Sequence, residues 1–406
     1  MSVKNGRDTL ETAARRARVA QSLGLNRNIA AASAVVFLMG MGEELWKKFL
    51  PKYLEALGAT AFAVGLFGTA KDFLDAIYQY PGGWIADHLG RRRAFLVFIA
   101  LACAGYLIYL FSAAWPFLFA GLVFAMAWNS MASPAVFALI GDALPRERRA
   151  AGFTIQSLLK RVPMALSPLI GGAMISALGL VAGIRLSLAL TIALAAVGVL
   201  AAMMINLPLE IGEATNIGGV WRSFHAGLKR LLISDIIIRT CEGMAEVLIV
   251  LYVTNISGVS LSRFGALVAA QMATSILVYI PAARVADRVG RKPFVIATFL
   301  CFALFPVAVV MAKGYAMLVA AFIIGGLREI GEPSRKAMIV DFARSDLRAR
   351  SVGLYYLVRS LSITPAAAAG GLLWNINPQV PFLCAGAIGL IGVIVFAATV
   401  EERYAS

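Results

Sequence analysis

The chain has 406 residues, of which 60% are apolar and 15% are charged, and its mean hydropathy is +0.81. These values indicate a membrane protein and exclude the soluble classes, soluble enzymes and nucleic-acid-binding proteins among them. The formal net charge of +15 does not point to nucleic acid, because the basic residues fall in short segments between apolar runs.

Apolar runs long enough to cross a hydrocarbon core of roughly 30 Å as helices of about 20 residues recur along the whole chain. We expect twelve spans, at residues 28–51, 60–83, 94–113, 116–140, 151–175, 183–207, 231–256, 263–285, 293–312, 316–342, 350–374 and 380–399. The prediction is an all-α membrane protein with an N-terminal segment at 1–27, a six-helix bundle at 28–207, a linker at 208–230, a second bundle at 231–400 and a tail at 401–406. The linker sequence VWRSFHAGLKRLL separates apolar from basic residues onto two helical faces, so we expect a short interfacial helix there.

The basic residues lie mostly on one side of the predicted membrane. Loops on the other side hold little beyond Lys52, Arg263 and Lys313. By the positive-inside rule, both termini are expected in the cytoplasm and the protein in the cytoplasmic (inner) membrane. Residues 1–27 are polar, so the first span itself, and not a cleavable signal peptide, is expected to direct insertion.

The second half of the chain repeats the first. YPGGWIADHLGRRRAF at 80–95 returns as IPAARVADRVGRKPFV at 280–295, an offset of 200 residues. Further matches, at an offset of 199, pair Lys160 with Arg359 and the diglycine at 171–172 with that at 370–371. Six spans are therefore followed by six equivalent spans.

With these motifs the chain resembles the major facilitator superfamily of transporters. GGWIADHLGRR is similar to that family's signature loop between spans 2 and 3, and ARVADRVGRK is a weaker copy between spans 8 and 9. A plain basic turn would account for one copy, but not for two at the same place in each half. The resemblance implies two pseudo-symmetric six-helix bundles that work by alternating access. It also implies a cytoplasmic gate formed by Gly83, Asp87, Gly90, Arg91, Asp142, Asp287, Gly290, Arg291 and Asp341.

Charged residues inside the predicted spans are not scattered. Spans 3, 9 and 12 have none, and span 6 has Arg185 alone. Each charge facing lipid at mid-depth would cost roughly 2.5–3.5 kcal/mol, so the charged side chains must face protein or water. In the family that the chain resembles, spans 3, 6, 9 and 12 are peripheral and the other eight line a central cavity, which agrees with this distribution. The predicted solute-binding residues are Glu43, Trp46, Lys71, Asp72, Trp128, Asn129, Lys160, Arg328, Glu329 and Arg359.

Some of these charges are expected to pair within one helix. The i, i+4 spacing predicts the pairs Glu43 with Lys47, Glu44 with Lys48, Lys71 with Asp75, and Arg328 with Glu332 with Lys336. The alternative for Lys47, Lys48, Arg335 and Lys336 is that they lie near span ends and extend to the membrane surface.

Proton coupling requires a carboxyl group whose pKa is raised by burial or by a nearby like charge. The predicted proton-coupling residues are Glu43, Glu44, Glu242 and Glu246. Lys160 and Arg359, at equivalent positions of the two halves, are predicted to hold an anionic group from two sides.

The mixture of acidic and basic groups favours a proton-coupled secondary transporter of a small anionic or zwitterionic solute. The sequence SPLIGG at 167–172 partly matches an antiporter signature and leans towards efflux, whereas span 4 lacks the Arg of many exporters and offers Asn129 instead. The alternatives are a multidrug/proton antiporter and a non-transporting membrane sensor or assembly subunit.

No enzyme activity is expected, because the chain has no nucleotide-binding loop or nucleophile motif. Two histidines and four scattered cysteines favour neither a metal site nor a cofactor. The expected partners are the charged solute, protons and membrane lipid, and the expected state is a monomer.

Overall fold

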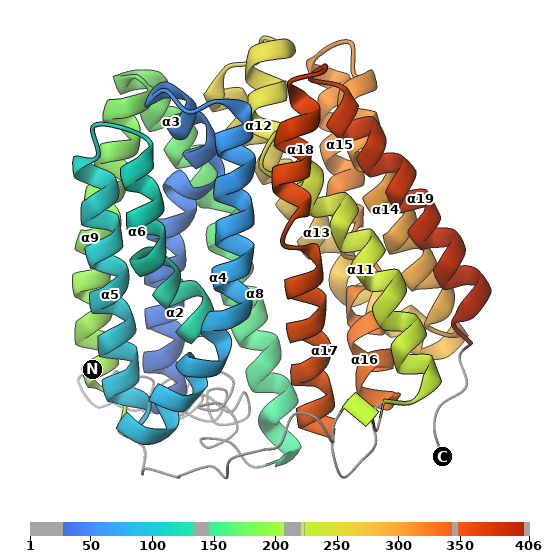
Figure 1. The fold of residues 1–406 in the computed structure, drawn as a ribbon. Coiled ribbons are helices and arrows are strands. Elements are labelled where there is room, and N and C mark those ends of the chain that lie inside the picture. Colours follow the sequence, from blue (N-terminus) through green and yellow to red (C-terminus); the bar gives the residue numbers. More distant parts are fainter. Residues whose placement is uncertain are drawn as a thin grey trace, which may run out of the picture.

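The computed structural model describes residues 27–132, 136, 146–206, 221–222, 224–342 and 348–401, and every regular element in these ranges is a helix (Figure 1). The first half contains α2 (Arg27–Trp46), η1 (Lys47–Phe49), α3 (Leu50–Ala56), α4 (Ala61–Leu89), α5 (Arg91–Phe111), α6 (Pro116–Met126), η2 (Ala127–Met131), α8 (Arg146–Leu178) and α9 (Leu180–Met203). The second half contains α11 (Ala226–Glu246), α12 (Ile249–Leu251), η3 (Tyr252–Ile256), α13 (Leu261–Val289), α14 (Lys292–Met311), α15 (Tyr315–Leu327), α16 (Glu332–Asp341), α17 (Arg348–Ile363), α18 (Ala366–Trp374) and α19 (Val380–Thr399).

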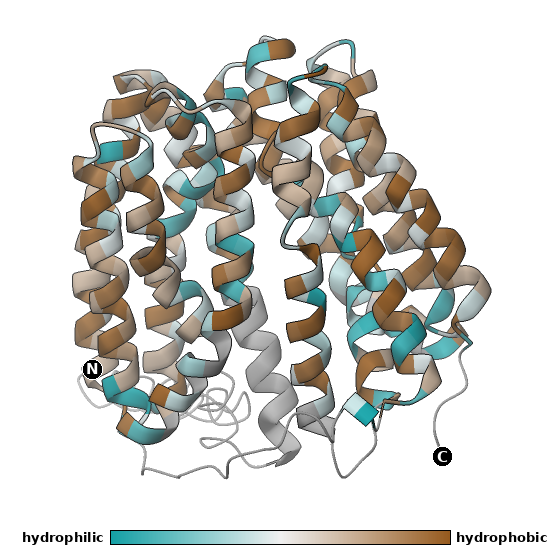
Figure 2. Ribbon diagram, viewed as in Figure 1, coloured by the Kyte–Doolittle hydropathy of each residue, from teal (hydrophilic) through white to brown (hydrophobic). Residues whose placement is uncertain are grey.

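The helices follow the predicted spans, and the protein is an all-α, multi-pass membrane protein. Seven helical segments in the described ranges are long and apolar enough to cross a membrane. Figure 2 shows apolar residues along the outer helices α5, α9 and α19, while polar residues gather inside each half. The linker differs from expectation in one respect: α11 begins at Ala226, capped by His225, so residues 226–230 belong to the seventh span. Residues 207–220 of the linker lie outside the described ranges.

The helices are interrupted at matched places in the two halves. α2 ends at Trp46 and α11 ends at Glu246, which are 200 residues apart like the sequence repeat. α6 changes into the π-helical turn η2 at 127–131, and α15 ends at Leu327, before residues 328–331 lead into α16. π-helical turns and 3₁₀ stretches inside longer helices often mark functional positions. Charged residues lie at the breaks of the first, seventh and tenth spans, whereas η2 in the fourth span contains the polar Asn129.

The two halves meet through small residues. A Cβ atom on Gly65 of α4 would lie 2.5 Å from the Ala367 carbonyl oxygen of α18. A Cβ atom on Gly265 of α13 would lie 2.3 Å from the Pro168 carbonyl oxygen of α8. Glycine is therefore required at both positions for the backbones to approach this closely.

The first described helix, α2, begins and the last one, α19, ends at the same face of the molecule, which we call the terminal face, and the other end is the opposite face (Figure 1). The two halves lie side by side in Figure 1, where α4 of the first half runs next to α18 of the second.

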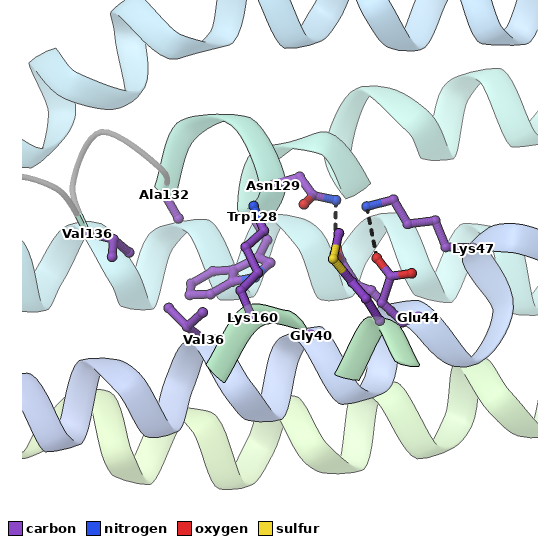
Figure 3. Close-up of a pocket in the computed structure, with 11 residues that line it drawn as sticks. Val36, Gly40, Glu44, Lys47, Trp128, Asn129, Ala132, Val136 and Lys160 are labelled. Atoms are coloured by element: carbon purple, nitrogen blue, oxygen red, sulfur yellow. Dashed lines mark hydrogen bonds and ion pairs between the residues drawn. The ribbon is translucent and has the colours of Figure 1, made fainter. Parts of the chain in front are cut away.

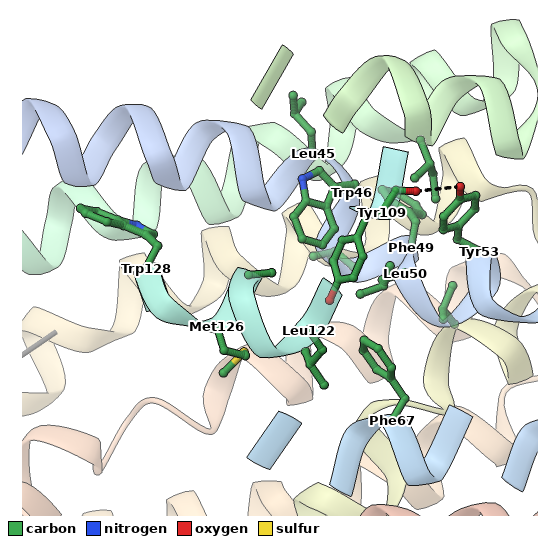
Figure 4. Close-up of a cluster of buried hydrophobic side chains, with 14 of the residues drawn as sticks. Leu45, Trp46, Phe49, Leu50, Tyr53, Phe67, Tyr109, Leu122, Met126 and Trp128 are labelled. Atoms are coloured by element: carbon green, nitrogen blue, oxygen red, sulfur yellow. Dashed lines mark hydrogen bonds between the residues drawn. The ribbon is translucent and has the colours of Figure 1, made fainter. Parts of the chain in front are cut away.

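An aromatic cluster fills the interior of the first half near the opposite face (Figure 4). Trp46 packs edge-on against Tyr106 and Tyr109, with ring centroids 5.7 and 5.6 Å apart. Its indole nitrogen donates to the Thr191 hydroxyl at 3.1 Å. Burial and a satisfied donor are the usual features of a structural tryptophan, so Trp46 lies in the packed interior.

Candidate functional site

A polar pocket lies inside the first half, between α2, η2 and α8 (Figure 3). Its volume is about 100 Å³, which is room for several water molecules or a small polar group. Its lining residues are Val36, Gly40, Glu43, Glu44, Lys47, Trp128, Asn129, Ala132, Val136, Lys160 and Met164. Five of the predicted site residues, Glu43, Glu44, Trp128, Asn129 and Lys160, are therefore neighbours in space.

Glu43 is held by neutral donors. Its side chain is buried, with the residue 4% exposed. The Tyr106 hydroxyl donates to one carboxylate oxygen at 2.5 Å, and the Asn129 amide donates to the other at 2.9 Å. No cationic side chain of the described residues lies within ion-pair distance of this carboxylate, in contrast to the predicted pair with Lys47.

Glu44 and Lys160 complete the polar lining. Glu44 is 5% exposed, its Oε1 lies 3.6 Å from the Lys47 ammonium, and its buried Oε2 has no hydrogen-bond partner. Within the described part of the chain, the Lys160 ammonium makes no hydrogen bond or ion pair. The pocket thus contains one carboxylate oxygen and one ammonium group that are both available to a ligand.

The second half contains a continuous chain of ion pairs. Asp235 is fully buried and accepts from Arg335 at 2.6 Å and from the Tyr355 hydroxyl at 2.9 Å, with Arg359 at 3.5 Å. Arg335 also donates to both oxygens of Glu332, at 3.0 and 2.7 Å.

The chain of ion pairs continues towards the break in the tenth span. Arg239 donates to Glu332 at 3.2 Å and to Glu242 at 2.7 Å. Arg328 reaches the other oxygen of Glu242 at 3.3 Å and stacks over the Phe302 ring. Each carboxylate in this series is therefore neutralised by at least one arginine.

Ion pairs also join the two halves. Lys48 donates to Glu246 at 2.7 Å, and Arg161 donates to Glu329 at 2.8 Å. Nearer the opposite face, Lys52 contacts both Glu55 and Asn255, and the Asn255 amide donates to Glu55 at 2.7 Å. These contacts link segments about 170–200 residues apart and hold the halves together on that side.

Several predicted pairings are wrong. Lys71 pairs with the adjacent Asp72 at 3.0 Å, and Asp75 accepts from Ser130 at 2.6 Å. Lys48 pairs across the halves and not with Glu44. Of the i, i+4 pairs, the one between Glu332 and Lys336 is present, at 3.6 Å.

Three other residues of the predicted spans have well-defined surroundings. The alternative that Arg335 extends to the membrane surface is wrong, since its side chain is 1% exposed and fully paired. Trp46 packs in the interior, as described above, and does not line the pocket. Arg359 contacts Asp235 and stacks over Tyr356 at 4.6 Å, so its guanidinium group is already paired with a carboxylate.

Five of the predicted gate residues lie at helix ends at the terminal face, namely Gly90, Arg91, Gly290, Arg291 and Asp341. Arg291 forms an ion pair with Asp341, and Gly90 and Gly290 have φ angles of +80° and +103°, a conformation that favours glycine. Arg91 begins α5. Asp142 lies outside the described residues, as do the side chains of Asp87 and Asp287 and the surroundings of Gly83. No cluster of potential metal ligands occurs in the described part.

The family model described as Major Facilitator Superfamily matches residues 32–241 and, separately, 231–406. The chain belongs to the major facilitator superfamily. An uncharacterized MFS-type transporter of Methanocaldococcus jannaschii is 23% identical over 390 residues, which cover 90% of this chain and 93% of the relative. The quinolone resistance protein NorA of Staphylococcus aureus is 28% identical over 150 residues, which cover 37% of this chain and 39% of NorA. The crystal structure of the nucleoside transporter NupG has the same fold, with a TM-score of 0.79 at 12% identity, covering 93% of this chain and 100% of NupG.

Asp235, which belongs to the ion-pair chain of the second half, was not predicted as a site residue from the sequence. It lies one turn before Arg239 in the seventh span, and three arginines contact it. Asp235 lies near the predicted start of that span, where contact with water is expected, and its burial was therefore not predicted. A carboxylate four residues before an arginine inside an apolar run was the available signal.

Proposed function

We propose that this superfamily member is a secondary active transporter that moves a small anionic or zwitterionic solute by alternating access and couples this movement to protons. The observation that supports the proposal is the set of ion pairs that joins the two halves at matched helix breaks. We further propose that the terminal face is cytoplasmic, as the distribution of basic residues predicts.

Ion pairs between the two halves suit a transporter, because they can break and re-form with other partners when the halves move. Lys48 with Glu246 and Arg161 with Glu329 connect the halves in this conformation. When the halves rotate, each partner needs a new neutralising group, because an unpaired charge at mid-depth is costly. A charged solute or a proton can provide it, so solute binding biases the equilibrium between the two conformations.

Among the four predicted proton-coupling residues, Glu43 is the first candidate. Glu242 and Glu246 contact arginine or lysine, which already compensate their charges. Among the described residues, Glu43 accepts hydrogen bonds from a hydroxyl and an amide, and both groups can also bond to a protonated carboxyl group. Lys71, Arg328 and the other predicted solute-binding residues remain proposals.

A second candidate function is export of drug-like compounds in exchange for protons. The partial likeness to NorA, a quinolone resistance protein, favours it. The dense and paired charges of this chain favour the charged-metabolite transporter.

The test is a thermal-shift screen of the purified protein with anionic, zwitterionic and cationic metabolites, because a ligand that binds only the folded protein raises its stability. A stabilising solute is then labelled and measured in counterflow into proteoliposomes that contain the unlabelled solute. We expect stabilisation and counterflow with an anionic or zwitterionic solute. Stabilisation and counterflow with lipophilic cations alone would favour drug export, and no counterflow with any stabilising solute would contradict transport.

A further inference from the structure

Resting on the proposed transport function, we infer that the pocket of the first half binds a proton and the anionic group of the solute at the same time. Glu43 takes the proton and Lys160 pairs with the anion. Proton and anion are then carried together, in the same direction. Each of the two ligand groups thus has its own binding residue in the pocket, and the direction of proton movement relative to the solute is defined.

The charges of the pocket are balanced before any ligand binds. Two carboxylates, Glu43 and Glu44, face two ammonium groups, Lys47 and Lys160. Of the other neighbours, Tyr106 on α5 is a neutral donor, and Asp75 on α4, which accepts from the Ser130 hydroxyl, does not line the pocket. Within the lining, one added proton therefore leaves one positive charge in excess, which an anion neutralises.

The geometry assigns the two roles to different residues. Lys47 lies 3.6 Å from Glu44, so its charge is already compensated. Lys160 has no such partner in the described part of the chain, although it lines the same cavity. An unpaired ammonium group beside a cavity of about 100 Å³ is a site for a carboxylate or phosphate group.

The neighbours of Glu43 can form hydrogen bonds with both the ionised and the protonated carboxyl group. The Asn129 amide donates to the ionised carboxylate at 2.9 Å, and after a half rotation its carbonyl oxygen can accept from the protonated acid. The Tyr106 hydroxyl can donate in both states. The carboxyl group therefore changes its charge without losing hydrogen bonds.

The buried Glu44 Oε2 atom, which has no hydrogen-bond partner, is independent evidence that the pocket is built for a ligand. A buried polar atom without a partner is destabilising unless a ligand or water satisfies it. A solute that carries a donor next to its anionic group, such as an amino acid, would satisfy this atom while Lys160 holds the acid group.

The sign of the coupling follows from electrostatics. An anion at Lys160 and a proton at Glu43 stabilise each other, because each reduces the charge that the other leaves in the pocket. A cation in the same pocket would instead compete with the proton, which is the basis of exchange. Anion binding that strengthens as the pH falls therefore indicates transport together, and cation binding that weakens indicates exchange.

The experiment measures ligand-induced thermal shifts of the full chain in detergent at about pH 5 and about pH 8. The ligands are benzoate, L-glutamate and inorganic phosphate, with tetraphenylphosphonium as the cation. We expect at least one anion to bind more tightly at the lower pH, by up to about tenfold per pH unit if one proton accompanies it. Lys160→Gln should abolish this binding, and Lys160→Arg, which keeps the charge, should retain it.

Glu43→Gln tests whether Glu43 is the group that binds the proton, because the amide imitates the protonated acid. We expect anion binding by this variant to be as tight at about pH 8 as at about pH 5. Glu55→Gln is the matched control, since it removes a carboxylate outside the pocket that contacts Lys52 and Asn255, and the pH dependence should remain. Pure, monodisperse variants with the wild-type helix content establish that each protein is folded.

Three results would overturn the inference. They are anion binding that does not depend on Lys160, pH dependence that survives in Glu43→Gln, and tighter binding of tetraphenylphosphonium than of every anion at the higher pH. Absence of anion binding by the wild type at both pH values would overturn it as well. Because solute counterflow is measured separately, a working transporter with the wrong pH dependence refutes this inference and leaves the proposed function intact.

Discussion

Replacing Arg335 by alanine tests whether the ion-pair chain of the second half stabilises the fold. The Arg335 side chain is 1% exposed and donates three hydrogen bonds, two to Glu332 and one to Asp235. Removing one partner of a buried ion pair costs about 3–5 kcal/mol, because the remaining charge is left without compensation. Asp235 keeps Tyr355 and Glu332 keeps Arg239, so we expect the lower end of this range, about 3 kcal/mol.

The neighbouring residue provides a matched control. Lys336 contacts the same carboxylate, Glu332, at 3.6 Å, but its side chain is 52% exposed. Such exposed pairs contribute about 0–1 kcal/mol, so Lys336→Ala should change stability little. The measurement is the midpoint of thermal unfolding in one detergent, in which Arg335→Ala should lower Tm by about 5 °C or more. Equal midpoints for the two variants would show that the buried network does not stabilise the protein as argued.

Three further substitutions test the interface and the interior. Glu246→Gln removes the charge that Lys48 contacts across the halves, so the opposite face should open more often, which labelling of cysteines introduced there would detect as faster reaction. Gly65→Ala should have the same effect, because its Cβ would lie 2.5 Å from a backbone oxygen of α18, whereas Gly353→Ala, with nothing within 4 Å, should have none. Trp46→Phe should lower the free energy of unfolding by about 1 kcal/mol, because one hydrogen bond is lost, and it should leave solute affinity unchanged. A large loss of affinity would show that the Trp46 indole takes part in solute binding.

The positions of the helices could be predicted from the sequence because membrane spans need about 20 apolar residues and charges cannot face lipid. The signature loop also pointed to real geometry: Gly90 and Gly290 both have positive φ angles, and Arg291 pairs with Asp341. Local spacing and a recognised motif are sufficient for features of this kind.

The partners of the charged residues could not be predicted in the same way. Lys47 follows the end of α2, where the chain becomes a 3₁₀ helix, and there residues three apart eclipse each other. It therefore meets Glu44 and not Glu43. Lys48 finds Glu246, 198 residues away, because the two broken helices face each other across the halves. Such contacts depend on how the bundles pack, which helical periodicity does not encode.

The most direct test of the account is solute-dependent proton movement in proteoliposomes that contain a pH-sensitive dye. Adding an anionic solute outside should acidify the interior, because proton and anion enter together, and Glu43→Gln vesicles should take up the solute without acidification. Alkalinisation of the interior, or acidification that persists undiminished in Glu43→Gln, would contradict the proposed coupling.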